Sequence, residues 1–221
     1  MKATPADSVF GEMYRQEAAV TERLAGAVGP RLLDVIDEEG WIVLVTDYIE
    51  GRHPDLTPGS EDVHHVLNAV DALADLLTPC PLADIPPATS NLVLRTAPSH
   101  HDVMEGGTLL HCDLRADNLI IANSRVHVID WGWPGRGAPW LDMAFLLPHL
   151  ITAGHSAADA QKLGETVSAY RDASPDAVAA FAATLTRFWE SRLTEGPQKL
   201  RAYRARAVRA GQEWGSHLKS R

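Results

Sequence analysis

The sequence lacks any long hydrophobic run and contains few cysteines. No apolar stretch approaches the roughly 18 residues of a membrane-spanning helix, so we expect no membrane association. The N-terminal segment MKATPADSVF has a lysine but no apolar core, which argues against a signal peptide. Cys80 and Cys112 are the only two cysteines, too few for a disulfide framework and without metal-ligand spacing. These absences together predict a cytoplasmic protein in a reducing compartment.

Basic residues are also scarce relative to acidic ones. The chain has 20 Lys and Arg against 29 Asp and Glu, a formal net charge of −9, which argues against a general nucleic-acid binder. An acidic balance would suit a cationic partner, but many acidic proteins bind none, so this inference is weak. The 45% hydrophobic and 22% charged residues are typical of a globular protein of one or two domains.

The first periodic segment predicts a helix from about Ser8 to Leu24. Its apolar residues follow the spacing of one helical face, and Glu17 lies on the same stripe. A carboxylate there either pairs with a cation or lies at the edge of the stripe and reaches water. Two short apolar runs follow, at 31–36 and 41–46, and the turn residues between them indicate a β-hairpin.

A polar connector separates this N-terminal part from the rest of the chain. Residues 47–52 read DYIEGR and are soon followed by Pro54 and Pro58, which favours a domain boundary. Ser60 can cap a helix that continues to about Leu77. The proline-rich stretch 78–107 shows no clear periodicity, and we assign it no element.

From residue 108 the pattern predicts short strands and then helices. Segments 119–121 and 126–129 flank the turn residues Asn123 and Ser124, which indicates a second hairpin. Helices are expected over about 140–150, 157–170, 175–194 and 197–218. We interpret the arginines of the last helix as a solvated face rather than a binding patch; they include Arg201, Arg204, Arg206 and Arg209.

The most informative pattern is His111-x-Asp113-x4-Asn118 followed by Asp130. Phosphoryl transfer from ATP requires a carboxylate near the acceptor hydroxyl and magnesium ions on the phosphates. Magnesium prefers oxygen ligands, and the predicted hairpin returns Asp130 to the loop that carries Asp113 and Asn118. The alternative is that these are ordinary turn residues around a buried histidine.

Two stretches, LLHCDLRADNLII and VIDWGWPGRGAPWLDMAFLL, resemble the aminoglycoside phosphotransferase and choline-kinase-like family, which has a protein-kinase-like fold. The resemblance implies that Asp113 is the catalytic base, that Asn118 and Asp130 bind Mg²⁺, and that His111 supports the loop. Asp142 would match a structural aspartate that braces the loop. Cys112 stands where the family usually has glycine.

Upstream, LVTDYIEGR is similar to the segment in which backbone groups near Asp47, Tyr48 and Ile49 hold adenine. Lys2 resembles the strand lysine that binds the ATP phosphates, and Glu17 resembles the helix glutamate that pairs with this lysine. The family's first two strands and Gly-rich loop have no counterpart ahead of Lys2, so we expect the Lys2–Glu17 pair to be frayed in a monomer. The exposed sheet edge beside Lys2 could then support a homodimer.

We therefore predict an α+β, protein-kinase-like two-lobe fold. A reduced N-lobe would span 1–46, a hinge 47–52 and a mostly helical C-lobe 53–221. The predicted function is an ATP- and Mg²⁺-dependent kinase that phosphorylates a hydroxyl of a small metabolite or antibiotic, cationic if the charge balance is a guide. The alternatives are a truncated pseudokinase that binds nucleotide or a partner without turnover and, more distantly, a metal-dependent hydrolase.

Overall fold

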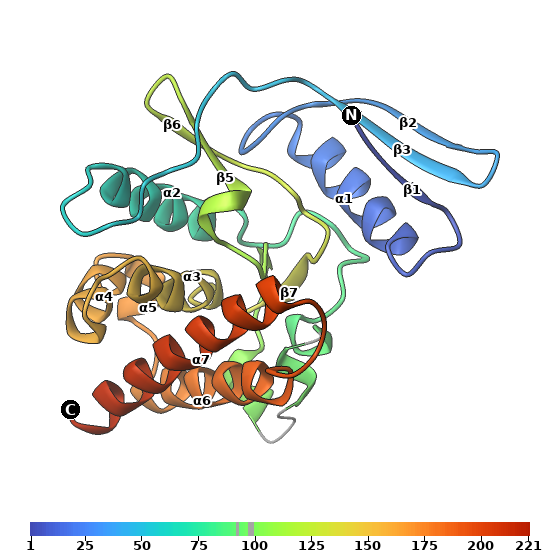
Figure 1. Ribbon diagram of the computed structural model, residues 1–221. Coiled ribbons are helices and arrows are strands. Elements are labelled where there is room, and N and C mark those ends of the chain that lie inside the picture. Colours follow the sequence, from blue (N-terminus) through green and yellow to red (C-terminus); the bar gives the residue numbers. More distant parts are fainter. Residues whose placement is uncertain (92, 97–99) are drawn as a thin grey trace.

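The computed structural model describes residues 1–91, 93–96 and 100–221. Three N-terminal strands and helix α1 lie at one end of the molecule, and helices α3–α7 lie at the other (Figure 1). Helix α2 and the β5–β6 hairpin lie between them. The strands are β1 (Lys2–Pro5), β2 (Leu32–Glu38), β3 (Trp41–Thr46), β4 (Thr108–Leu110), β5 (Leu119–Ala122), β6 (Arg125–Val128) and β7 (Gly135–Gly137). The α-helices are α1 (Gly11–Leu24), α2 (Asp62–Leu76), α3 (Leu141–Thr152), α4 (Ala157–Gly164), α5 (Ser168–Arg171), α6 (Pro175–Ser191) and α7 (Gln198–Lys219).

The N-terminal sheet is antiparallel with the strand order β1-β3-β2. The predicted β2–β3 hairpin is confirmed, and its two turn residues, Glu39 and Gly40, both have positive φ, as a tight turn between twisted strands requires. Ile42 and Leu44 of β3 are fully buried against Ala18 of α1. In the described residues β1 pairs with β3 alone, and the homodimer through its other edge stays a prediction.

The segment predicted as a hinge is attached to the β5–β6 hairpin. Arg52 and Ile121 exchange two backbone hydrogen bonds of 3.1 and 2.7 Å. The Arg52 guanidinium also donates from Nη2 to Oδ1 of Asp62, the first residue of α2, over 2.8 Å. The chain leaving the N-terminal sheet is therefore held against both β5 and α2, while the division into lobes at 47–52 stays a prediction.

The second predicted hairpin, β5–β6, is also confirmed. Leu119 pairs with Val128 and Ala122 with Arg125. Asn123 and Ser124 both have positive φ and form the turn. The open end of this hairpin faces the loop that follows β4, so the hairpin delivers residues 118 and 130 to one place.

The helices of the C-terminal part are close to those predicted, with one exception. The single helix predicted over 157–170 is wrong, because α4 ends at Gly164 and α5 begins at Ser168. A Cβ at position 164 would lie 3.1 Å from the Tyr170 ring, and the Ser168 N–H donates to the Asp71 carboxylate over 2.7 Å. That carboxylate caps the second helix from α2, a contact that helical periodicity does not reveal.

The arginine-rich helix α7 is only partly a solvated face. Arg201, Arg206 and Arg209 are exposed, as predicted. Arg204 is buried instead, and its Nη1 donates to the carbonyls of Arg192 and Glu195 over 2.8 and 2.6 Å. It therefore satisfies carbonyl groups at the C-terminal end of α6. Among the residues that the structure describes, no helix has the length and apolar character needed to cross a membrane.

Candidate active site

Asp142 in α3 holds the loop that follows β4 through backbone hydrogen bonds. The Asp142 carboxylate accepts the backbone N–H of His111 at Oδ2 and that of Cys112 at Oδ1, both over 2.9 Å. Burial raises the pKa of Asp142 to about 6, although the two N–H donors act in the opposite direction. The predicted bracing of the loop by Asp142 is thus a direct pair of hydrogen bonds.

Cys112 adopts a left-handed conformation, with φ of 61°. Glycine reaches this region without steric cost, whereas a side chain with a Cβ is strained there. The backbone explains why glycine is suited to this position. Cys112 itself is buried, and burial raises the pKa of its thiol well above the ordinary value.

His111 is completely buried and connects the loop to the strand that precedes Asp130. Its Nε2 lies 2.9 Å from the Ile129 carbonyl, so this nitrogen carries the proton and donates it. The ring packs edge-on against Trp131, with 4.8 Å between centroids. Burial lowers the pKa of His111 to about 4, so the ring is neutral at pH 7. These contacts hold the His111 side chain between the loop and the segment that precedes Asp130.

Asp113 and Asn118 lie together at the two ends of the loop. Asn118 Nδ2 donates to the Asp113 carbonyl over 2.8 Å and to its carboxylate over 3.2 Å. Burial raises the pKa of Asp113 to about 6; nearby Arg115 and the Asn118 hydrogen bond oppose the rise, and the charge of Asp130 adds to it. A carboxylate with a pKa near neutral pH is suited to accept a proton from a hydroxyl.

Asp130 lies at the open end of the β5–β6 hairpin, next to Asn118. The Ile129 N–H donates to the Asn118 carbonyl over 3.0 Å, which continues the strand register by one residue pair. Asp130 has φ of 63°, a conformation that aspartate and asparagine tolerate better than most residues. The predicted convergence of Asp113, Asn118 and Asp130 therefore occurs.

The Lys2 ammonium lies against the Asp130 carboxylate. Its Nζ donates to Asp130 Oδ1 over 2.9 Å and also forms an ion pair with Glu17. Our expectation that the Lys2–Glu17 pair is frayed is wrong, because β1 is held in register opposite β3 and places Lys2 over α1. Burial acts against the charged ammonium, but Glu17 and Asp130 outweigh it and hold the pKa of Lys2 above its ordinary value.

The donor set fits a magnesium ion bound together with phosphates. Asp130 offers one exposed carboxylate, which already accepts a cation, and the backbone hydrogen bond from Ile129 to Asn118 holds the amide-bearing residue next to it in the fold. Among the described residues, no group of three or more His, Cys, Asp or Glu side chains could hold a metal without further ligands. Magnesium commonly binds one or two protein carboxylates and completes its shell with phosphate and water.

A cavity of about 370 Å³ lies between the N-terminal sheet and the β5–β6 hairpin. We call it the nucleotide cavity; its lining includes all the residues that the sequence suggested for ATP, namely Lys2, Glu17, Asp47, Tyr48 and Ile49, together with Asp130. Sequence reasoning missed the part of the lining formed by the α1–β2 connection. The glycine at position 29 was the one sequence signal for this part. A Cβ at Gly29 would lie 2.2 Å from the Val128 carbonyl oxygen, so glycine alone fits this close approach.

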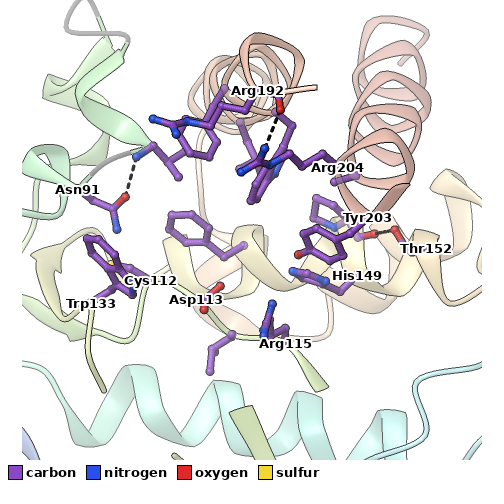
Figure 2. Close-up of a pocket in the computed structure, with 18 of the residues that line it drawn as sticks. Asn91, Cys112, Asp113, Arg115, Trp133, His149, Thr152, Arg192, Tyr203 and Arg204 are labelled. Atoms are coloured by element: carbon purple, nitrogen blue, oxygen red, sulfur yellow. Dashed lines mark hydrogen bonds between the residues drawn. The ribbon is translucent and has the colours of Figure 1, made fainter. Parts of the chain in front are cut away.

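A second cavity, of about 310 Å³, opens at the Asp113 carboxylate, and we call it the acceptor cavity (Figure 2). Helices α3, α6 and α7 supply most of its walls. Residues 112–115 of its lining belong to the motif that the sequence revealed, whereas the lining residues on α6 and α7 carry no motif and the sequence offered no signal for them. The two cavities lie on either side of the Asp113–Asn118–Asp130 group. Asp130 lines the nucleotide cavity, and Asp113 lines the acceptor cavity.

No protein-family model matches the sequence, and no curated protein matches it. Solved structures do match the fold. An amicoumacin kinase in complex with AMP-PNP and Ca²⁺ superposes with a TM-score of 0.59 at 13% identity, over 98% of this chain and 81% of that chain. An aminoglycoside phosphotransferase from Alicyclobacillus acidocaldarius gives 0.58 at 11% identity, over 99% and 85% of the two chains. A choline kinase from Streptococcus pneumoniae gives 0.57 at 19% identity, over 93% and 83%.

The chain has the kinase-like fold of these proteins. The predicted fold class, α+β with small sheets and a mostly helical C-terminal part, is confirmed. In this kinase-like fold the nucleotide cavity is lined by residues of the N-terminal sheet, α1 and the β5–β6 hairpin, and the acceptor cavity is lined mostly by residues of α3, α6 and α7.

Proposed function

We propose that this protein is an ATP-dependent kinase that transfers the γ-phosphoryl group to a hydroxyl of a small molecule. The observation that carries the proposal is the arrangement of two carboxylates between two cavities. Asp130 lines the nucleotide cavity beside Lys2, and Asp113 lines the acceptor cavity. The known activities of proteins with this fold, as choline kinases and aminoglycoside phosphotransferases, agree with the proposal.

In the proposed reaction the acceptor hydroxyl lies at the Asp113 carboxylate. The acceptor oxygen forms a bond to the γ-phosphorus, and the bond from that phosphorus to the bridging oxygen breaks, so that its electron pair leaves with ADP. Asp113 accepts the hydroxyl proton, for which its raised pKa is suited. His111 and Asp142 keep the loop in place and do not contact the reacting atoms.

The nucleotide would be held by the residues of the nucleotide cavity. Backbone groups at 47–49, which line this cavity, would hold adenine, and Lys2, paired with Glu17, would bind the phosphates. Asp130 and Asn118 would hold Mg²⁺, which supplies neutralisation of the phosphate charge when bound.

A second candidate function is nucleotide binding without turnover. The contact of Lys2 with Asp130 favours it, because an ammonium at that carboxylate competes with a metal ion. The two candidates differ in whether bound ATP is consumed, and one set of variants separates them.

The test is calorimetric titration of Mg-ATP into the wild-type protein and into Asp130→Asn and Asp113→Asn. Asparagine retains the size of each side chain and tolerates the positive φ at position 130. We expect Asp130→Asn to weaken binding by about 100-fold and Asp113→Asn to change it by less than about threefold. ADP production with an accepted substrate should fall by about 10²–10⁴-fold in Asp113→Asn.

Asp172→Asn is the matched control, because the Asp172 side chain is exposed on the surface and lines neither cavity. It should leave both binding and turnover unchanged. Equal loss of Mg-ATP affinity in the two site variants would show that the roles are assigned wrongly. Tight Mg-ATP binding without ADP production from any hydroxyl compound would favour the second candidate.

A further inference from the structure

The charge of the acceptor cavity is opposite to the charge of the whole chain. Among the described residues, Asp113 is the one carboxylate in its lining, whereas three guanidinium groups line it: Arg115, Arg192 and Arg204. His149 also lines it, and burial together with the charge of Arg115 lowers the pKa of this imidazole to about 4, so it is neutral at pH 7. A cationic acceptor would therefore meet three cations and one carboxylate, and the net charge of −9 is a poor guide to this cavity.

Two of the three arginines have internal partners. Arg204 donates to two carbonyl groups after α6, as described above. Arg192 Nη1 lies 3.1 Å from the Glu195 carboxylate, and its guanidinium lies over the Phe188 ring at 5.0 Å. These contacts give Arg192 and Arg204 a structural role, although their positive charge still acts on the cavity.

Arg115 has fewer internal partners than Arg192 and Arg204. Its Nη2 lies 3.3 Å from the exposed carboxylate of Asp117. Its Nε, like the Nε of Arg204, is buried and has no hydrogen-bond partner in the described part of the chain. Figure 2 shows this guanidinium beside His149 and Tyr203, close to the Asp113 carboxylate. Because the Arg115 side chain is about one-third exposed and its carboxylate partner is itself exposed, an anionic group of a ligand can bind the accessible part of this guanidinium.

Most of the remaining wall of the acceptor cavity is apolar and largely aromatic, although Asn91, Thr152 and Tyr203 also line it. Its apolar residues include Trp133, Phe145, Leu185, Phe188 and Trp189. Aromatic walls favour a flat apolar body, and the volume of about 310 Å³ lies at the lower end of the roughly 300–1,000 Å³ of small-molecule sites. A highly hydrated polycation would lose its water against these walls without gaining a matching carboxylate.

We infer that the acceptor is a hydroxy acid with an apolar body of aromatic size. Its carboxylate binds Arg115, its hydroxyl faces Asp113, and its body lies against the aromatic walls. Figure 2 shows the Arg115 guanidinium close to the Asp113 carboxylate, and the two residues are separated by one position in the loop. The hydroxyl and the carboxylate should therefore be on adjacent carbon atoms, as in a 2-hydroxy acid. The role of the hydroxyl rests on the proposed kinase function, but the preference for a negative charge does not.

Three compounds test the inference; all have the same phenyl body and the same secondary hydroxyl, and they differ in the group at the carboxylate position. They are phenyllactate, the diol in which a hydroxymethyl group replaces its carboxylate, and the amino alcohol in which an aminomethyl group replaces it. Each is titrated calorimetrically into the protein at neutral pH without nucleotide. We expect phenyllactate to bind at least about tenfold more tightly than the diol, and the amino alcohol to bind most weakly.

Arg115→Gln should remove the preference for phenyllactate over the diol and leave the affinity for the diol unchanged. Arg201→Gln is the control, because Arg201 is exposed on α7 and does not line the cavity. The inference is overturned if the amino alcohol binds as tightly as phenyllactate, or if Arg115→Gln weakens all three compounds equally. It is also overturned if phenyllactate shows no binding up to about 10 mM.

Phosphorylation of the same compounds with Mg-ATP separates this inference from the proposed function. Selective binding of phenyllactate together with a complete lack of Mg-ATP binding would refute the kinase function and support the charge preference. Preferential phosphorylation of the amino alcohol would support the kinase function and refute the charge preference.

Discussion

Replacing Asp113 by asparagine should make the protein more stable at neutral pH while it abolishes phosphoryl transfer. The carboxylate is held in a partly buried position where its charge is unfavourable, and asparagine removes that charge at nearly constant volume. Its Oδ1 can still accept the hydrogen bond from Asn118 Nδ2, which spans 3.2 Å in the wild type. A residue retained for catalysis at a cost in stability commonly behaves in this way.

The magnitude follows from the pKa of the carboxyl. It rises from 3.8 to about 6 on folding, with burial as the largest cause. One pKa unit corresponds to about 1.4 kcal/mol, so ionised Asp113 destabilises the fold by up to about 3 kcal/mol. Because the side chain keeps some contact with solvent, we expect a gain of about 1–3 kcal/mol in the free energy of unfolding.

The sign of the pH dependence identifies the cause. The folded carboxyl binds its proton up to a higher pH than the unfolded one, so in the wild type this group lowers the free energy of unfolding as the pH rises from about 4 to about 6. The variant lacks this change. The difference between variant and wild type should therefore be small near pH 4, grow up to about pH 6, and stay constant at higher pH. Other carboxylates, Asp142 among them, are present in both proteins and cancel.

Denaturant unfolding of both proteins across this pH range is the assay, and Asp172→Asn is the control that should change stability by no more than about 0.5 kcal/mol. A variant that is less stable than the wild type at pH 8 would contradict the argument. A stability difference that does not change with pH would show that the gain comes from packing and not from the charge.

Two further predictions concern the loop that carries Asp113. Asp142→Ala should lower the free energy of unfolding by about 2–4 kcal/mol, because it leaves the buried N–H groups of His111 and Cys112 without their acceptor; denaturant unfolding measures it, and a loss below about 1 kcal/mol would mean that water replaces the carboxylate. Cys112→Gly should be more stable than Cys112→Ala by about 1 kcal/mol, the reverse of the usual order, because φ at this position is 61°. Thermal unfolding of the two variants checks the order, and a more stable alanine variant would show that the loop relaxes out of the left-handed conformation.

The sequence predicted the parts of the site that depend on local signals. The catalytic-loop residues and the β5–β6 hairpin were identified because turn residues and short strands occur at fixed spacing around them. Asn123 and Ser124 accept positive φ, and this brings residues 118 and 130 together without help from distant parts of the chain. The helices α2, α6 and α7 were predicted for a similar reason, since their buried residues recur with the helical period.

Contacts between distant parts of the chain could not be predicted in this way. Lys2 and Asp130 are 128 residues apart, and their contact exists because β1 pairs with β3 above the β5–β6 hairpin. The break between α4 and α5 depends on Asp71 of α2, which the Ser168 N–H reaches across the fold. Such contacts depend on how elements pack, and periodicity within one element contains no information about its neighbours.

The sequence by itself determined where Asp113, Asn118 and Asp130 gather, because a single loop and hairpin place a carboxylate, an amide and a second carboxylate. The tertiary structure alone decided what surrounds them. The cavity at Asp113 is formed by side chains from α3, α6 and α7, and helix packing places Arg192 and Arg204 on its wall. An overall charge of −9 is distributed over the whole surface, whereas the field inside a cavity is set by the few groups that face it.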